Sequence, residues 1–156
     1  MNNTNTTLAI WQRLTRLPAG RWLFSRIVCF KAPYFSSIRP TFITVRRGYS
    51  ELQIKKRRAV LNHIGTVHAI AICNMAELAA GVATDITIPS THRWIPIGMT
   101  VEYLKKAHTH LRAVAELNEI PSYDKTIDIP VNVNVMDTEN NTVLRAVITI
   151  RISPRK

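Results

Sequence analysis

The chain has 156 residues, of which 46% are hydrophobic and 20% charged, the composition of a globular protein that forms one domain with a real core. No stretch reaches the roughly 18–20 unbroken apolar residues of a membrane span, and the N-terminus lacks the charged-then-apolar order of a signal peptide. Together with only two cysteines, Cys29 and Cys73, these features predict a reduced, cytoplasmic protein.

The positive charge is unevenly placed along the chain. Residues 1–60 contain twelve Lys and Arg and one acid, Glu51, whereas residues 61–156 contain nine of each kind. The formal net charge of +11 therefore belongs to the N-terminal part of the protein. Such a charge favours an anionic partner: substrate phosphates, an acidic carrier protein, a lipid surface or nucleic acid. The charge alone does not choose among them.

Residues 1–40 are predicted to form a basic, helical N-terminal extension. Residues 8–17 predict a short amphipathic helix, which Pro18 ends. Residues 21–30 predict a second helix, rich in aromatic and basic residues, that packs on the domain or on a partner subunit. The same composition is typical of helices that lie on a membrane surface, so peripheral membrane contact stays open.

Residues 41–156 are predicted to form the main domain. An alternating pattern over residues 41–57 predicts a two-stranded hairpin. Four more strands follow at residues 93–106, 111–117, 127–135 and 144–152, and Pro130 indicates an edge or a bulge in the third of these. Between the two groups, residues 69–82 are apolar except for Asn74 and Glu77. They predict a long helix, capped by Thr66 and buried on every face. This order predicts an α+β fold, with an antiparallel sheet of about six strands wrapped around one central apolar helix.

The segment around the start of this helix resembles the hotdog-fold thioesterases, in their phenylacetyl-CoA thioesterase-like branch. The pattern of that branch is Asn-x-x-Gly-Thr-x-His-Gly-Gly, followed by a carboxylate. Here the matching positions are Asn62, Gly65, Thr66, His68, Ala69-Ile70 and Glu77. Two positions depart from the pattern: Ala69-Ile70 replaces the glycine pair, and Pro96 stands where some relatives carry a serine. Within the superfamily the chain is most similar to a bacterial hotdog family of unknown function.

The resemblance implies hydrolysis of an acyl-CoA or acyl-carrier-protein thioester, with no cofactor beyond the coenzyme A of the substrate. The backbone N–H of Ala69, in the first helical turn, suits an oxyanion donor. Glu77 in apolar surroundings suits a general base for water. Asn62, with Gly65 in its loop, is expected to hold the water or the carbonyl, and His68 to orient the group. The alternative for Glu77 and Asn62 is structural: a carboxylate that caps a partner's amides, and an amide that satisfies its own loop.

Spacing along the helix predicts a homodimer. Ala69 and Glu77 are eight residues apart, or about 12 Å at 1.5 Å per residue, so they cannot both touch one carbonyl. Two central helices packed antiparallel across a twofold axis would bring Glu77 of one copy to Ala69 and Asn62 of the other. The resemblance implies such a dimer, and pairing of dimers into tetramers stays open.

Further residues are expected to bind substrate. The run Lys55, Lys56, Arg57 and Arg58 is placed to receive coenzyme A phosphates or a carrier's acidic face, or else is a solvated strand end. Tyr103 is expected at the same entrance. The histidines show no metal-ligand spacing, so no metal is expected. A non-catalytic acyl-CoA-binding protein is the alternative function, and no recognised motif supports nucleic-acid binding.

Overall fold

The helices and strands follow the predicted order in a computed structural model that describes residues 5–118, 120 and 124–155. The N-terminal part forms the helices α1 (Thr6–Leu14) and α2 (Gly20–Lys31) and the 3₁₀ helix η1 (Pro33–Ile38). The hairpin β1 (Thr41–Arg46) and β2 (Tyr49–Ile54) follows, and η2 (Arg58–Val60) leads to the central helix α3 (Ala69–Asp85). The remaining strands are β3 (His92–Tyr103), β4 (Leu111–Glu116), β5 (Ile127–Met136) and β6 (Thr142–Pro154).

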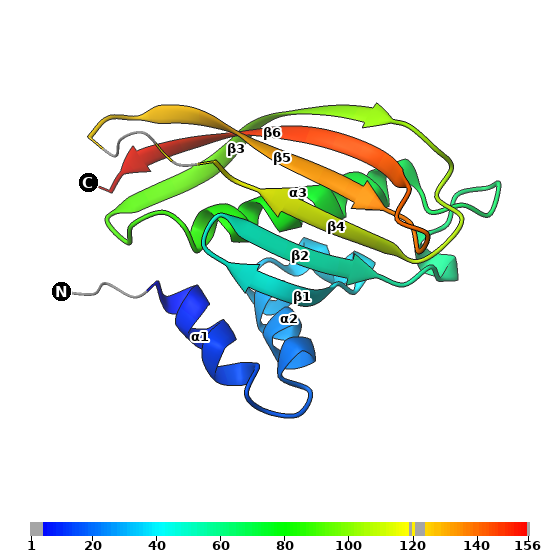
Figure 1. The fold of residues 1–156 in the computed structure, drawn as a ribbon, viewed down its shortest axis with the longest axis horizontal. Helices are drawn as coiled ribbons and strands as arrows, with labels where there is room; N and C mark the ends of the chain where they lie inside the picture. Colours follow the sequence, from blue (N-terminus) through cyan, green and yellow to red (C-terminus); the bar gives the residue numbers. More distant parts are fainter. Residues whose placement is uncertain (1–4, 119, 121–123, 156) are drawn as a thin grey trace.

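The six strands form one antiparallel sheet in the order β1-β2-β4-β5-β6-β3. Figure 1 shows the sheet curving over α3, with α1 and α2 on the β1 side. The predicted α+β fold, a six-stranded antiparallel sheet wrapped around one long helix, is therefore confirmed.

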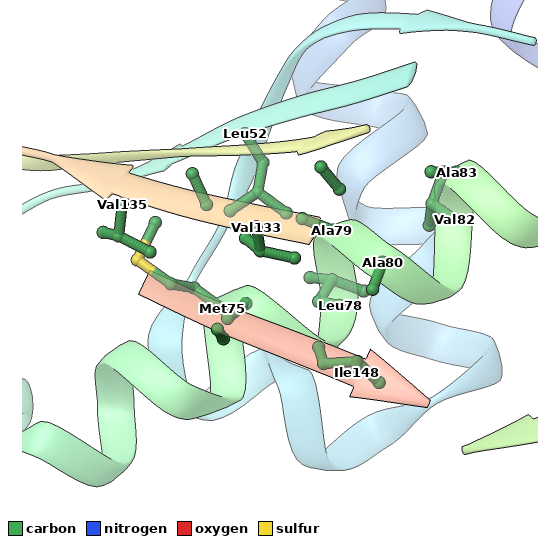
Figure 2. Packing of buried hydrophobic residues seen from close by; sticks show 14 of the residues in the cluster. Leu52, Met75, Leu78, Ala79, Ala80, Val82, Ala83, Val133, Val135 and Ile148 are labelled. Atoms are coloured by element: carbon green, nitrogen blue, oxygen red, sulfur yellow. The ribbon is translucent and has the colours of Figure 1, made fainter. Parts of the chain in front are cut away.

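Small side chains let α3 lie close against the sheet. Ala76, Ala79, Ala80 and Ala83 are fully buried. In Figure 2, larger side chains of the helix and of the strands fill the space beside them, among them Met75, Leu78, Leu52, Val133 and Ile148. The buried hydroxyl of Ser50, on β2, donates to the Ala79 carbonyl at 2.6 Å. This bond adds a polar contact between the strand and the middle of the helix.

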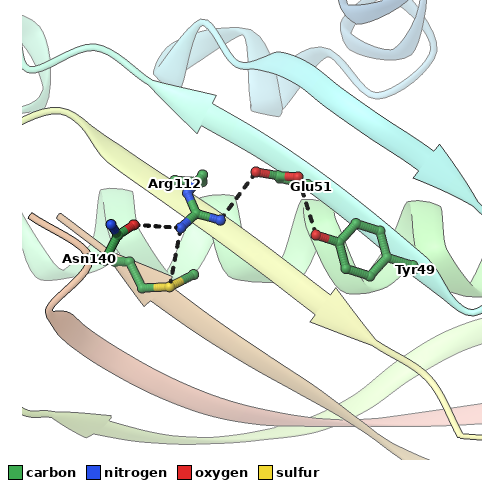
Figure 3. A network of polar contacts seen from close by, with 5 residues as sticks. Tyr49, Glu51, Arg112 and Asn140 are labelled. Atoms are coloured by element: carbon green, nitrogen blue, oxygen red, sulfur yellow. Dashed lines mark hydrogen bonds and ion pairs between the residues drawn. The ribbon is translucent and has the colours of Figure 1, made fainter. Parts of the chain in front are cut away.

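A polar network ties β2 to β4 on the face of the sheet turned away from α3. Arg112 donates to Glu51 at 3.2 Å and to Asn140 at 2.9 Å, and the Tyr49 hydroxyl donates to Glu51 at 3.2 Å (Figure 3). Partial burial and the adjacent Glu51 carboxylate raise the pKa of Tyr49. The network stabilises the pairing of strands whose inner face carries the core.

The two edges of the sheet differ. Helix α2 covers β1, where the fully buried Ser25 hydroxyl accepts the backbone N–H of Phe42 at 2.9 Å. Trp11, Phe24 and Phe42 pack edge to face there, with ring centroids 5.0 and 5.4 Å apart. Strand β3 is the other edge, and no strand of the described chain lies beyond it. Its exposed large apolar side chains include Ile95, Ile97 and Met99.

Two local predictions were wrong, and one, at Pro130, is confirmed. His68, not Thr66, is the N-cap of α3, because the Thr66 hydroxyl is engaged by the Asn62 amide. The prediction of an edge at Pro130 is confirmed locally: β5 lies between β4 and β6, but its pairing with β4 ends at Asn132, so at Pro130 the strand pairs only with β6. Helix α3 is not buried on every face, since Ile70 and Glu77 are exposed on it.

Candidate functional site

Helix α3 leaves one face uncovered by its own sheet. This face carries four side chains that lie three or four residues apart along the helix, with Cys73 and Asn74 adjacent: Ile70, Cys73, Asn74 and Glu77. Ile70 is 56% exposed and Glu77 is exposed, whereas Cys73 and Asn74 are nearly buried between them. The expectation that Glu77 is enclosed by apolar surroundings within the chain is wrong. It is instead an exposed charged side chain on the open face of the helix.

Two largely apolar cavities meet at Glu77. The first, of about 350 Å³, lies between the N-terminal helices and the end of α3, and its lining includes Val28, Phe35, Gly81, Asp85, Trp94 and Pro96. The second, of about 530 Å³, is lined by Tyr34, Phe35, Ile70, Cys73, Asn74, Met99, Val101 and Tyr103 in addition to Glu77. Both volumes fall in the range that binds small molecules. The Glu77 carboxylate therefore lies where it can contact a polar group of a ligand whose apolar part occupies either cavity.

The far end of the first cavity is held by Asp85, at the last residue of α3. Its carboxylate accepts the Trp94 indole N–H at 3.1 Å and the Thr7 hydroxyl at 2.6 Å. The Asn5 side chain donates to the Asp85 carbonyl. The N-terminal segment thus fixes the position of Trp94 in the cavity wall, although these residues lie far apart in the sequence.

Tyr103 and Cys73 form a polar contact in the second cavity. The Cys73 sulfur and the Tyr103 hydroxyl are 3.6 Å apart. The hydrogen bond with Cys73 raises the pKa of Tyr103 above its ordinary value of 10.0. The Tyr103 hydroxyl thus lies in the cavity that Glu77 also lines, with Cys73 as its partner there.

The start of α3 presents a hydrogen-bond donor. The Ala69 N–H donates no hydrogen bond within the described part of the chain, as is usual for the first turn of a helix. The Nδ1 atom of exposed His68 accepts the Ile70 N–H at 3.0 Å, so the neutral ring carries its proton on Nε2. His68 therefore caps the helix and directs a second donor outward.

Asn62 and Gly65 shape the loop ahead of the helix. The Asn62 Oδ1 accepts the N–H groups of Ile64 and Thr66, both at 3.1 Å, and its Nδ2 donates to the Thr66 hydroxyl at 2.8 Å. Gly65 has φ = 78°, a conformation that favours glycine. Neither residue lines a cavity that contains Glu77. The structural alternative for Asn62 is supported, and only its second Nδ2 hydrogen remains for a ligand.

Asn74 is a candidate that the sequence reasoning missed as a functional residue. Its side chain is 8% exposed, donates to the Ser37 hydroxyl at 3.2 Å, and leaves Oδ1 buried with no partner in the described chain. It lines both the 530 Å³ cavity and a neighbouring cavity of about 200 Å³ that includes His68. The signal was present, because Asn74 is one of two polar interruptions in the apolar run.

The basic run separates in the structure. Lys55 and Arg57 line a cavity of about 170 Å³ together with Arg39, which the sequence analysis did not single out. Lys56 and Arg58 do not line it; the Lys56 N–H donates to His110, and Arg58 begins η2. Partial burial and the neighbouring Arg39 lower the pKa of Arg57. None of the three cations around this cavity forms an ion pair within the described residues, so the cavity favours an anion.

Two searches of the described chain bear on other kinds of site. No three His, Cys, Asp or Glu side chains gather there in a metal-binding arrangement. None of the helices within these residues is long and apolar enough to cross a membrane.

Comparisons with known proteins complete the description. A family model described as a domain of unknown function, DUF4442, matches residues 20–152. The solved structural-genomics protein APC5556 is 47% identical, with a TM-score of 0.82, and the match covers 96% of this chain and 99% of that one. No functionally curated protein matches the sequence.

More distant structures share the fold. A probable thioesterase from Pseudomonas aeruginosa is 18% identical with a TM-score of 0.78, covering 89% of this chain and 97% of that one. A thioesterase from Haemophilus influenzae is 11% identical with a TM-score of 0.69, covering 78% and 82%. At these identities the likeness establishes the fold. The resemblance to the hotdog-fold thioesterases is confirmed.

Proposed function

Since the chain belongs to the DUF4442 family and has a thioesterase-like hotdog fold, we propose that it hydrolyses an acyl thioester. The observation that carries the proposal is the position of Glu77. Its carboxylate, on the uncovered face of α3, lines two largely apolar cavities at once, whereas the other carboxylate of the first cavity, Asp85, is engaged by Trp94 and Thr7. In this proposal one of those cavities takes the acyl group, and the carboxylate activates water beside the thioester carbon.

The proposed site is composite and needs a second copy of the chain. Exposed Ile95, Ile97 and Met99 lie on the open edge strand β3, and such an edge favours pairing with another strand. Joining two copies at β3 would bring their α3 helices together. Glu77 of one copy then faces Ala69 of the partner subunit, which resolves the separation of about 12 Å along a single helix. Dimers are the proposed unit, whether or not they pair further.

The proposed reaction uses one water and one thioester. The water oxygen bonds to the carbonyl carbon while Glu77 takes a water proton, and the negative charge that develops on the carbonyl oxygen is met by the Ala69 N–H and the helix dipole. Collapse of this intermediate breaks the C–S bond. The thiolate leaves and receives the proton held by Glu77, so the products are a carboxylic acid and a thiol. Tyr103 is a further donor to the carbonyl or the sulfur.

Coenzyme A or a carrier-protein phosphopantetheine is the proposed leaving thiol. Arg39, Lys55 and Arg57 form the phosphate-binding part of the site, with Lys56 and Arg58 at its margin. The Arg57 guanidinium donates to the Ser37 carbonyl, and the Ser37 hydroxyl accepts the Asn74 amide. These two hydrogen bonds link the cationic cavity to the helix face that carries Glu77.

The direct test is thiol release from acyl-CoA substrates of several chain lengths. Glu77→Gln is expected to lower the rate at least ~10²-fold, the scale of losing a general base. The exposed Glu116→Gln is the matched control and is expected to turn over at the wild-type rate. Full turnover by Glu77→Gln would refute the proposed role.

A mixing experiment tests the composite site. Ala69→Pro removes the oxyanion donor at the first helical position, where proline is tolerated. Mixed and re-equilibrated with Glu77→Gln, it forms heterodimers in which one site has both groups intact. Two inactive proteins are then expected to regain about a quarter of the wild-type rate, because half of the dimers carry one working site of two. No recovery, with heterodimers present, would place both groups in one chain.

A non-catalytic acyl-CoA-binding protein is the second candidate, and the start of α3 favours it. Ala69-Ile70 replaces the glycine pair of the thioesterase pattern, and exposed Ile70 adds bulk beside the Ala69 N–H. Tight binding of acyl-CoA with no thiol release from any substrate would select this alternative.

A further inference from the structure

The hairpin formed by α1 and α2 carries an exposed apolar stripe. Phe30 is 88% exposed and Trp22 is 57% exposed, and Leu17 and Leu23 are also exposed. Leu23 and Phe30, seven residues apart, lie on one face of α2, and Trp22 is exposed in the first turn of the helix, whereas Phe24, Ser25 and Cys29 are buried. We call Leu17, Trp22, Leu23 and Phe30 the apolar stripe.

Cations without acidic partners accompany the stripe. Residues 1–50 contain no Asp or Glu. Arg13, Arg16, Arg21 and Lys31 are exposed around the hairpin, and none of them forms an ion pair within the ranges that the structure describes. Large apolar side chains bordered by arginine and lysine are typical of helices that lie in the interface of a membrane.

The hairpin also projects from the domain. Figure 1 shows α1 and α2 extending from the β1 side, away from the sheet, with their connection at the far end. That connection, residues 15–19, holds exposed Arg16 and Leu17. A flat surface could therefore meet the tip and the open side of α2 without contacting the sheet.

We propose that this hairpin docks on an anionic lipid bilayer. The apolar stripe enters the headgroup boundary while the surrounding cations meet lipid phosphates. A second copy of the chain fits less well, because a twofold contact through this patch would set the same cations against each other. Nucleic acid would use the cations and leave four large apolar side chains in water. The proposal does not depend on thioester hydrolysis.

The test is flotation of the full chain with vesicles of phosphatidylcholine alone or mixed with phosphatidylglycerol. Binding to the anionic vesicles is expected, at least tenfold weaker without phosphatidylglycerol and weakened by salt. Arg16→Glu/Arg21→Glu is expected to weaken binding roughly tenfold or more, because each cation near an anionic surface contributes. The charge-matched control is Lys125→Glu/Arg145→Glu, both exposed outside the hairpin, and it is expected to bind like wild type.

A second variant separates the stripe from the charge. Trp22→Ser/Phe30→Ser keeps every cation and is expected to lose most vesicle binding, with unchanged circular dichroism and unchanged mass by light scattering. Retained binding would refute the proposal. So would a drop in oligomeric mass, which would assign the stripe to a second copy, or retention by duplex DNA without binding to anionic vesicles.

Discussion

The indole of Trp94 lies over Gly81, so close that a β-carbon at residue 81 would come within 2.9 Å of the ring atom Cη2. The ring cannot move away freely, because its N–H donates to Asp85 at 3.1 Å. Both residues line the 350 Å³ cavity beside Glu77. Because Gly81 has no side chain, the Trp94 ring can pack against the α3 backbone, and this packing sets the position of the cavity wall.

Gly81→Ala tests this packing. An alanine in a helix interior normally stabilises by about 1 kcal/mol relative to glycine. Here the added methyl group must displace the indole, so we expect a net decrease of roughly 1–2 kcal/mol in the free energy of unfolding. Urea denaturation measures it. In the Trp94→Phe background, where the larger ring is absent, the same substitution should cost less, and equal costs in both backgrounds would contradict the contact.

Ser25→Ala tests how the β1 edge is closed. The substitution leaves the buried Phe42 N–H without its acceptor, which should lower the free energy of unfolding by about 1–3 kcal/mol. Ser36→Ala is the control, because the Ser36 hydroxyl is exposed and donates only to a carbonyl three residues earlier. A change there of less than ~0.5 kcal/mol is expected. Equal effects of the two substitutions would show that Ser25 has no special role.

Asn74→Leu separates a stability role from a ligand role. The wild-type Oδ1 is buried without a partner, so an apolar replacement of similar size should leave stability unchanged or raise it by up to ~1 kcal/mol. If Asn74 meets the substrate, KM should rise several-fold while thermal stability does not fall. A variant that is less stable and kinetically normal would make Asn74 a structural residue.

Asp128→Asn predicts a dependence on pH. The hydrogen bond from Arg151 holds the pKa of Asp128 below its ordinary value of 3.8. The ionised carboxylate therefore contributes stability at neutral pH, and this contribution is lost as the pH falls through the lowered pKa. The variant should be slightly less stable than wild type at pH 7, with the difference shrinking in acid. A constant difference from pH 7 to pH 2 would contradict the pair's role.

The layout of the fold was predictable because its signals are local. Alternation in the strands and the apolar run from Ala69 to Val82, which only Asn74 and Glu77 interrupt, predict the sheet and its central helix without any knowledge of contacts. The exposure of Glu77 was not predictable in this way. An apolar run looks the same on all sides, and only the assembled sheet reveals which side of α3 it leaves open.

The site was predictable in part for a similar reason. The motif identifies Asn62, His68 and Glu77 on one short segment. It does not show that the Asn62 side chain forms three hydrogen bonds within its own loop. Arg39 joins Lys55 and Arg57 only after the chain folds back on itself. The Gly81–Trp94 contact likewise joins a helix to a strand, and the hydrophobic periodicity of neither element predicts it.

The attachment of Asn5 and Thr7 to Asp85 has a practical consequence for anyone who purifies this protein. A protease that clips the first seven residues would cut no strand and remove no catalytic candidate. It would nevertheless remove the hydrogen bonds from Asn5 and Thr7 to Asp85, the residue whose carboxylate holds the Trp94 side chain in place. Preparations trimmed in this way should differ from intact material in ligand capacity while giving the same circular dichroism spectrum.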